Sequence, residues 1–334
     1  WRFLLTGERQ ESVRVSLPKG VSPEFTLSRL ERTGDAVTAG IIKDAGDDPD
    51  VTHGAEIITT VRAGAPGSGI TFAAGEGVGH VTLPGLPLAV GEPAINPKPR
   101  EIIAANLAEV AEELDAVCDL HVTVSIPGGE ALAVNTANGR LGILGGLSIL
   151  GTTGVVVPYS CASWIHSIHR GIDVARAAGI DHIAGSTGRT SEETVRNLFG
   201  LQEQALIDMG DFAGGMLKYL RRKPIPKLTI AGGFGKLAKL ADGEMDLHSS
   251  RSRVNTAMLA RWLAEAGADK PMVEAAAACT AAAQVLALAE GYQPMLAERC
   301  ARGAREVALA TLSGDVAVDV LVIDRGGNQL AHVG

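Results

Sequence analysis

Two short segments in the C-terminal half indicate the fold: Asp181-His-Ile-Ala-Gly-Ser-Thr-Gly188 and Lys227-Leu-Thr-Ile-Ala-Gly-Gly-Phe-Gly-Lys236. Each begins with a short apolar run typical of a buried strand and ends in a glycine-rich turn that leads into a helix candidate. A third segment, Arg140–Gly154, repeats this order of strand candidate and glycine-rich turn. Strand, turn and helix in repetition predict a parallel sheet with helices on its faces, which is the doubly wound, Rossmann-like α/β fold.

We expect this second domain to span residues 136–334. Its apolar periodicity predicts further helices. Four of these helix candidates lie at 160–178, 191–199, 205–220 and 272–290. A terminal hairpin begins with the strand candidate Val316–Ile323 and turns at Gly326-Gly327, because paired glycines favour tight turns.

Residues 1–135 are expected to form a separate α+β domain. From residue 12 to 82, short β-rich runs alternate with Gly, Pro and Asp clusters, and a helix candidate at 100–114 precedes a strand candidate at 121–126. The chain opens at Trp1 in a pattern typical of the end of a helix. We therefore expect this domain to lack its native N-terminal segment.

Composition narrows the class of protein. A chain of 334 residues exceeds the size at which a single core usually stops growing, which supports two domains. A formal charge of −8 argues against nucleic-acid binding, which requires a basic surface. The four cysteines show no C-x-x-C spacing, and no segment has the composition of a membrane span or a secretory signal. We expect a cytoplasmic protein with neither nucleic-acid nor membrane partners.

The three glycine-rich turns predict a cofactor site. Ligands of open parallel sheets bind at the carboxyl ends of the strands, where glycine lets backbone N–H groups approach closely. The spacing does not match G-x-G-x-x-G, so NAD is not specifically indicated. As an alternative, these glycines only permit the strand-to-helix turns. The cofactor-binding candidates are Gly145, Gly146, Gly151, Thr152, Thr153, Gly154, Gly185, Ser186, Thr187, Gly232, Gly233, Gly235 and Lys236.

An acidic loop between Lys43 and Glu56 contains three further candidates, Asp47, Asp48 and His53. The loop does not match the register of a calcium-binding loop, so we expect no metal site in the protein. Nearby carboxylates would raise the pKa of a histidine, which makes His53 a candidate proton donor. Asp, Gly and Pro in this number are equally explained by turns and helix caps.

Three more polar side chains lie in loops and are catalytic candidates: Glu76, Glu92 and His248. The two glutamates lie among Gly and Pro residues, which is typical of rigid loops and of ligand-contacting loops alike. His248 is close in sequence to Arg251 and Arg253, which could bind carboxylates, although a solvated loop is an equal alternative. The chain has no G-x-S-x-G elbow, P-loop or H-E-x-x-H motif.

Several of these segments resemble the signature blocks of the CbiD family, the cobalt-precorrin-5B C(1)-methyltransferases. The resembling blocks are Gly40–Glu56, Gly75–Gly79, Val90–Pro97, Leu141–Gly154 and Gly235–Leu240. The tail through Asp324-Arg-Gly326 also resembles the end of that family. The resemblance therefore covers nearly the whole chain, except for an N-terminal segment of the family that is absent ahead of Trp1.

The resemblance implies transfer of a methyl group from S-adenosyl-L-methionine to C-1 of cobalt-precorrin-5B, giving cobalt-precorrin-6A in anaerobic cobalamin biosynthesis. Cobalt would then belong to the substrate, a small corrinoid, and neighbouring pathway enzymes become candidate partners for intermediate hand-over. Two alternatives stay open: a nicotinamide-dependent reductase, which would use the same turns, and a non-catalytic carrier of a corrinoid intermediate. Methyl transfer requires mainly positioning and exclusion of water, so a catalytic base is optional.

Overall fold

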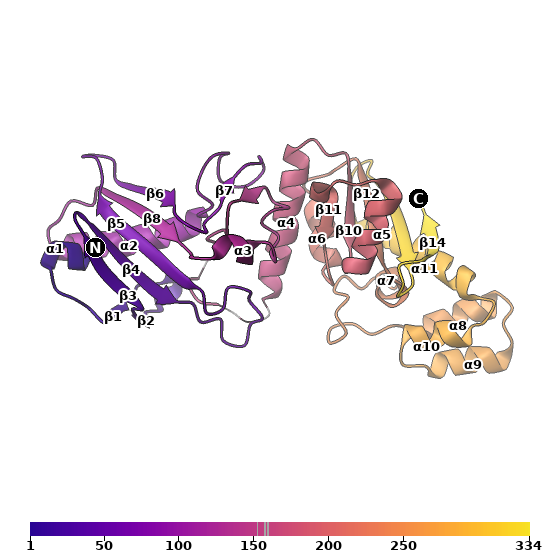
Figure 1. Cartoon of the computed structure of the whole chain (residues 1–334). Coiled ribbons are helices and arrows are strands. Elements are labelled where there is room, and N and C mark those ends of the chain that lie inside the picture. Colours follow the sequence, from indigo (N-terminus) through magenta and orange to yellow (C-terminus); the bar gives the residue numbers. More distant parts are fainter. Residues whose placement is uncertain (152, 157, 159) are drawn as a thin grey trace. The chain divides into compact units, whose positions relative to one another are not determined.

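The structure is a computed structural model that describes residues 1–151, 153–156, 158 and 160–334. It divides into two compact units, Trp1–Ser160 and Cys161–Gly334, which are described separately (Figure 1). The N-terminal unit is built on a mostly antiparallel sheet and the C-terminal unit on a mostly parallel one, so the expected α/β class is confirmed. The division lies after Ser160 rather than after residue 135, because Ile143–Leu144 pairs with His80–Val81 and because Leu147 and Ile149 form bridges with Val78 and Ile95.

The N-terminal unit contains a five-stranded sheet in the order β3-β4-β5-β8-β6. All neighbouring strands are antiparallel except β6 and β8, which run parallel. The strands are β3 (Arg29–Thr33), β4 (Ala36–Ile42), β5 (Glu56–Ala63), β6 (Ile70–Ala74) and β8 (Leu120–Ser125). Alternate side chains of β8, namely those of Leu120, Val122 and Val124, are buried, because successive side chains of a strand point to opposite faces.

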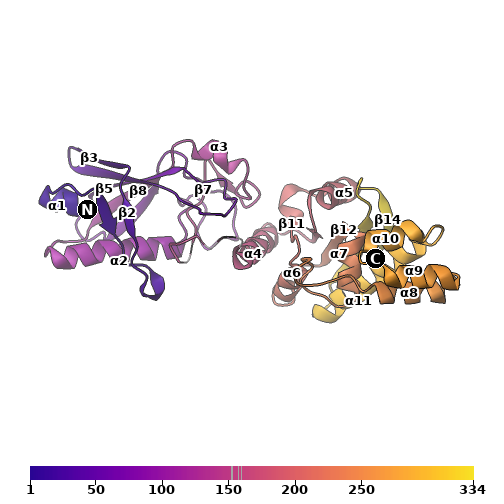
Figure 2. The same cartoon turned by 90° about the horizontal axis from the view of Figure 1, so that it is seen from below.

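A long helix, α2 (Pro97–Glu113), covers the apolar face of this sheet (Figure 2). Its residues Ile103 and Leu107 pack against the buried cluster that includes Val61 and Val122. Smaller elements complete the unit: α1 (Arg2–Thr6), β1 (Ser12–Arg14), η1 (Pro18–Gly20), β2 (Glu24–Thr26), β7 (His80–Val81), α3 (Gly129–Ala133) and β9 (Ile143–Leu144).

The strand predicted at 140–144 does not form as expected. Only Ile143–Leu144 (β9) is extended, and it pairs antiparallel with β7 of the N-terminal unit instead of opening the parallel sheet. The preceding residues form consecutive turns, in which the N–H of Leu141 donates to Ala137 O at 3.1 Å and that of Gly142 to Gly139 O at 3.0 Å. Gly142 has a φ of 72°, which ends these turns and leaves room for only a two-residue strand.

The C-terminal unit is an open sheet in the order β11-β10-β12-β13-β14, with only the last pair antiparallel. Its strands are β10 (His182–Ser186), β11 (Leu206–Asp208), β12 (Lys227–Gly233), β13 (Ala317–Ile323) and β14 (Gln329–Val333). The helices are α4 (Cys161–Ala177), α5 (Arg189–Phe199), α6 (Ala213–Leu220), α7 (Phe234–Ala241), α8 (Thr256–Glu265), α9 (Lys270–Ala278), α10 (Ala282–Leu288) and α11 (Gln293–Thr311), with a short η2 (Glu203–Ala205).

Helices cover both faces of this sheet, as a doubly wound fold requires (Figure 2). On one face, Ile183, Ile230 and Val320 belong to a large core shared with α4, α6, α7 and α11. On the other face, Ala231 and Leu321 belong to a smaller core with α5. Both faces of the central strands are therefore largely buried, which explains their mostly apolar sequences, although Thr229 of β12 and Asp319 of β13 are buried polar residues.

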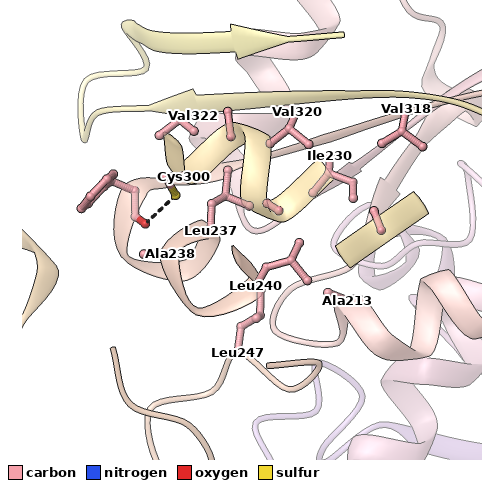
Figure 3. Packing of buried hydrophobic residues seen from close by; sticks show 14 of the residues in the cluster. Ala213, Ile230, Leu237, Ala238, Leu240, Leu247, Cys300, Val318, Val320 and Val322 are labelled. Carbon is pink, nitrogen blue, oxygen red and sulfur yellow. Dashed lines mark hydrogen bonds between the residues drawn. The ribbon is translucent and has the colours of Figure 1, made fainter. Parts of the chain in front are cut away.

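Helix α7 is firmly fixed to the sheet (Figure 3). Its fully buried residues Leu237 and Leu240 pack in the core to which Val320 of β13 also belongs. Cys300 of α11 is buried beside them, and its thiol lies 3.8 Å from the carbonyl oxygen of Phe234. Burial raises the pKa of the Cys300 thiol. The first turn of α7 thus has little freedom to move.

Two expected helices differ from the structure. The segment 205–220 is not one helix, because Leu206–Asp208 pairs in parallel with β10 and the helix α6 begins only at Ala213, after Gly210 with a φ of 52°. The segment 272–290 is divided into α9 and α10, since the side chain of Gln284 accepts hydrogen bonds from the backbone at 280 and 281. The terminal hairpin is confirmed. Among the described residues, no helix has both the length and the apolarity needed to span a membrane.

Candidate functional site

A pocket of about 1130 Å³ lies at the carboxyl ends of β10, β12 and β13. The connection after β10 leads to β11 on one side, whereas the connection after β12 leads to β13 on the other, so the strand order reverses between β10 and β12. Ligands of open parallel sheets bind at such a switch point. The fold therefore places a ligand pocket where the two glycine-rich turns of the parallel sheet end.

Loops from six parts of the C-terminal unit line this pocket. They are the turn after β10, the loop after β11, the turn after β12, the segment 247–254 and the break between α9 and α10, together with the turn after β13. Of the residues expected at the cofactor site, Thr187, Gly233, Gly235 and Lys236 line it. Of the catalytic candidates, only His248 does.

Two helices begin at the pocket. Gly188 and Gly233 are the N-cap residues of α5 and α7, and neither supplies a side chain to cap the first backbone N–H groups. Such N–H groups, together with the helix dipole, favour an anionic or hydrogen-bond-accepting ligand. A Cβ on Gly233 would meet no atom within 4 Å, so the backbone there is open to the pocket.

The neighbouring glycines have a different role. A Cβ on Gly185 would lie 2.3 Å from the sulfur of Met216, and one on Gly232 would lie 2.7 Å from the side chain of Thr187. Both positions need glycine for packing inside the sheet. Ser186 is also buried, with a relative exposure of 1%. These three expected cofactor residues therefore lie beneath the pocket and do not line it.

Lys236 connects three of the loops. Its ammonium donates to the carbonyl oxygen of Thr187 at 2.9 Å and lies 3.0 Å from Oδ1 of Asp211. The first turn of α7 is thereby tied to the segments that follow β10 and β11. This lysine acts on the geometry of the pocket rather than standing ready to bind a substrate carboxylate.

A second lysine of α7, Lys239, is buried with a relative exposure of 7% and also lines the pocket. Its ammonium donates to the carbonyl oxygen of Leu247 at 2.8 Å. In the part of the chain that the structure describes, no carboxylate lies within 4 Å of it. A buried cation with only a carbonyl partner favours an anion nearby.

The segment after α7 brings His248 and Arg253 to the pocket, whereas Arg251 does not line it. The ring Nδ1 of His248 lies 2.7 Å from Oγ of Ser250 and accepts the N–H of the same residue at 3.2 Å. The imidazole is thus held in one orientation at the rim. Of the two arginines that the sequence indicated, only one contributes to the pocket.

The acidic loop of the N-terminal unit is held together by Lys43. Its ammonium pairs with Asp50, whose other oxygen accepts the N–H of Thr52 at 2.8 Å. Burial alone would raise the pKa of Asp50, but the hydrogen bonds from Lys43 and Thr52 outweigh it and lower that pKa. The loop is therefore a closed turn with a structural ion pair.

The three candidates on this loop differ in their surroundings. Asp47 is exposed and Asp48 is half-buried. His53 is exposed, and its Nδ1 accepts the backbone N–H of Ala45 at 3.1 Å. A proton on that nitrogen would break this hydrogen bond, so only Nε2 of His53 is free to donate.

Glu92 belongs to the architecture of its loop. Its carboxylate accepts the N–H of Ala89 at 2.8 Å and pairs with Arg100 at 3.1 Å, and Arg100 also donates to Ile95 O at 2.7 Å. The N–H of Ala89 and, next, the guanidinium of Arg100 lower the pKa of Glu92. Glu76, in contrast, is exposed, while its backbone oxygen accepts the N–H of Ile126 at 2.7 Å.

The expected cofactor turn at 145–154 belongs to the N-terminal unit, whereas the turns at 185–188 and 232–236 belong to the C-terminal unit. A Cβ on Gly146 would lie 2.3 Å from the carbonyl group of Gly77, so this glycine permits contact between two backbones. The N–H of Leu147 donates to Gly77 O at 2.9 Å, and the N–H of Gly79 donates to Leu147 O at 2.9 Å. Glycine here serves packing between the blocks 75–79 and 145–149.

The remaining described residues of this turn differ in their surroundings. A Cβ on Gly154 would lie 2.6 Å from Leu17, whereas Gly145 and Gly151 face open space. Thr153 Oγ1 donates to Val155 O at 2.8 Å, which closes a local turn. Thr152 lies outside the described residues.

Several pocket residues were missed in the sequence. Asp211 and Lys239 line the pocket, as do Thr280, Ala281 and Arg325. Asp211 follows the unexpected strand β11, and Thr280 and Ala281 form the unexpected break between α9 and α10. The Gly210-Asp211 pair after an apolar run is a turn signal that could have revealed the first of these.

An open parallel sheet with a large pocket at its switch point, into which two helix N-termini open, defines a doubly wound α/β ligand-binding protein. Sequence comparison gives the family. The family described as CbiD matches residues 1–158, and the one described as CbiD, C-terminal domain, matches residues 246–334. The chain belongs to the CbiD family, so the resemblance of its signature blocks is confirmed.

Curated relatives match over nearly the full chain. The cobalt-precorrin-5B C(1)-methyltransferase of Paramagnetospirillum magneticum is 58% identical over 96% of this chain and 89% of that protein. The protein of the same name from Methylorubrum extorquens is 55% identical over 98% of this chain and 91% of its own length. A 1.9 Å crystal structure of cobalamin biosynthesis protein (cbiD) from Archaeoglobus fulgidus is 27% identical, covers 75% of this chain and 77% of that chain, and has a TM-score of 0.38.

Proposed function

We propose that the protein transfers a methyl group from S-adenosyl-L-methionine to C-1 of cobalt-precorrin-5B, giving cobalt-precorrin-6A in cobalamin biosynthesis. The observation that carries this proposal is the 58% identity to a relative of that name over 96% of the chain. Membership of the CbiD family supports it independently in both units, because the two family matches lie at opposite ends of the chain.

The pocket of the C-terminal unit fits a nucleoside-containing methyl donor. Phe234, Leu247, Val254 and Leu286 provide apolar surface for an adenine ring, and the open backbone at Gly233 provides N–H donors for a carboxylate. When bound, the donor supplies an electrophilic methyl group. We assign its binding to the turns 187–188 and 233–236, with Gly185, Ser186 and Gly232 supporting these turns from the sheet.

The protein's contribution to methyl transfer is positioning and exclusion of water. An in-line approach of a ring carbon to a methyl group requires fixed partners, and effective molarities for well-oriented groups are large. Lys236 fixes the loops after β10 and β11 against α7, and the sheet and α11 fix α7 itself. The geometry therefore holds the pocket in one shape. Methyl transfer by positioning of this kind does not require a strong catalytic base.

The catalytic candidates can now be ranked by their surroundings. His248 lies at the pocket, and we propose that it contacts a bound ligand or accepts a proton there. The exposed groups of Asp47, His53 and Glu76 are proposed to contact the tetrapyrrole. Glu92 is proposed to maintain its loop through Arg100, since both of its oxygens already accept hydrogen bonds.

Mass spectrometry of the corrinoid product tests the proposed function. Purified full chain, S-adenosyl-L-methionine and cobalt-precorrin-5B should give a product heavier by one methyl group, with the label transferred from a methyl-labelled donor. A reductase would instead consume NADPH on addition of the corrinoid. A carrier would bind the pigment and return it without a change in mass. Either of these two results, in the absence of methyl transfer, would refute the proposal.

A further inference from the structure

The pocket of the C-terminal unit has a strong excess of positive charge. Five cationic side chains line it, Arg189, Lys236, Lys239, Arg253 and Arg325, against the two carboxylates of Asp211 and Asp324. This excess contrasts with the net charge of −8 of the whole chain. Like charges gathered around one cavity repel each other, so the arrangement favours a ligand with several negative charges.

Both carboxylates of the lining are already occupied. Asp211 pairs with Lys236 at 3.0 Å. Asp324 accepts the N–H groups of Gly326 and Asn328, each at 2.8 Å, and the side-chain amide of Asn328 at 2.9 Å. The hydrogen bonds from Asn328 are the main cause that lowers the pKa of Asp324. This carboxylate therefore accepts hydrogen bonds within the turn between β13 and β14. Neither group is free to neutralise the remaining cations.

Three of the cations have no carboxylate partner among the described residues. Arg189 pairs with Glu193 at 2.8 Å, and Lys236 is tied to Asp211. For Lys239, Arg253 and Arg325, no carboxylate of the described residues lies within 4 Å. Lys239 is also buried, so its ammonium is shielded from bulk water beside the pocket.

S-adenosyl-L-methionine does not explain this charge. Its sulfonium and ammonium groups are positive and it has only one carboxylate, so it would add a cation to a cationic pocket. The pocket, at about 1130 Å³, is also larger than the range of roughly 300–1000 Å³ typical of small-molecule sites, which leaves room for part of a second ligand. Methyl transfer requires the donor and the acceptor to meet in one place.

We propose that Lys239, Arg253 and Arg325 form a carboxylate-binding subsite that holds the peripheral acid side chains of a polycarboxylated tetrapyrrole at the mouth of the donor pocket. Arg253 and Arg325 bind carboxylates through their paired N–H groups, and the buried ammonium of Lys239 attracts the deepest one. The identity of the ligand rests on the proposed function. The requirement for several negative charges rests on the pocket alone.

Uroporphyrin, a stable tetrapyrrole with a carboxylate on every peripheral side chain, serves as the probe. Its binding to the full chain is followed by fluorescence quenching, with coproporphyrin, in which methyl groups replace the acetate side chains, as the less charged comparison. We expect tighter binding of uroporphyrin and a dissociation constant that rises with salt, because paired charges at a pocket mouth are screened. Equal binding of both porphyrins, or of neither, would overturn the proposal.

Neutral variants locate the subsite. Arg253→Gln and Arg325→Gln should each weaken uroporphyrin binding roughly three- to tenfold, which corresponds to one partly exposed charge-assisted contact. Arg251→Gln is the matched control, because Arg251 lies in the same loop but does not line the pocket. Its binding should stay within twofold of the parent protein. Lys239→Met is added only after circular dichroism shows an unchanged fold, since Lys239 is buried.

Two further experiments test whether the site recognises phosphate instead and separate this inference from the proposed function. ADP competes with uroporphyrin if the site recognises phosphate, and tighter binding of ADP with the same dependence on Arg253 and Arg325 would overturn the carboxylate assignment. Methyl-transfer kinetics separate this inference from the proposed function. If methyl transfer proceeds with an unchanged KM for the corrinoid in both arginine variants, the subsite is wrong and the function stands. If methyl transfer is absent but uroporphyrin binding depends on both arginines, the subsite stands and the function is wrong.

Discussion

Replacing Lys236 with methionine measures how strongly this side chain holds the pocket together. Its ammonium donates to Thr187 O at 2.9 Å and pairs with Asp211 at 3.0 Å. A hydrogen bond to a charged group contributes roughly 1.5–3 kcal/mol when shielded, and an exposed ion pair about 1 kcal/mol at most. The side chains of Lys236 and Asp211 are 37% and 22% exposed, so values near the lower ends apply. We expect the free energy of unfolding of the C-terminal unit to fall by about 2 kcal/mol.

A double-mutant cycle with Asp211→Asn isolates the ion pair from the rest. Asp211→Asn alone should cost about 1 kcal/mol, and the double variant should cost no more than Lys236→Met, which gives a coupling energy of about 1 kcal/mol. Urea unfolding followed by tryptophan fluorescence is the assay, since Trp164 and Trp262 both lie in the C-terminal unit. Lys270→Met removes an exposed pair with Glu274 and should have an effect below about 0.5 kcal/mol. Additive effects of the two pocket substitutions would refute the stabilising ion pair between Lys236 and Asp211.

Three further perturbations test other parts of the structure. Gly146→Ala should destabilise the N-terminal unit by about 3 kcal/mol, because the new Cβ would meet the carbonyl group of Gly77. Gly145→Ala is the control: its Cβ faces open space, and it should cost about 1 kcal/mol for the left-handed backbone. Urea titrations of both variants compare the two free energies of unfolding. The lowered pKa of Glu92 stabilises the folded unit above about pH 4.5, and this contribution is lost as the pH falls through the folded pKa. In Glu92→Gln this contribution is absent, so the urea midpoint should fall less steeply with decreasing pH on the acid side. Leu237→Ala, in the fully buried core under the pocket, should cost about 2–5 kcal/mol in calorimetry or urea unfolding.

The parallel sheet could be predicted because its central strands have a local signature. Buried on both faces, β10 and β12 are mostly apolar, and each must turn sharply into a helix, which places glycine at or after its end. Strand β11 has no such signature. It consists of Leu206–Asp208, and only pairing with β10 distinguishes these three residues from the start of a helix. Edge position and tertiary pairing decided its structure.

The candidate site was predictable only in part, for a related reason. A glycine-rich turn after an apolar run has the same pattern whether the glycine opens a pocket, as Gly233 does, or receives another backbone, as Gly146 does. The partner of Gly146 is Gly77, which is far away in the sequence. Likewise, nothing local distinguishes Lys236, tied to Asp211, from Lys239, which has no carboxylate partner among the described residues. The difference between these two lysines arises from the packing of α7.

The thiol of Cys300 provides the C-terminal unit with an internal reporter. It is fully buried, and its raised pKa keeps it protonated at neutral pH, so it cannot react as a thiolate with alkylating reagents in the native state. Modification requires α11 to separate from α7, and the rate of labelling at that cysteine therefore measures the free energy of opening. Mass spectrometry of the peptide that contains Cys300 would follow how a ligand in the pocket slows that opening, without any engineered probe.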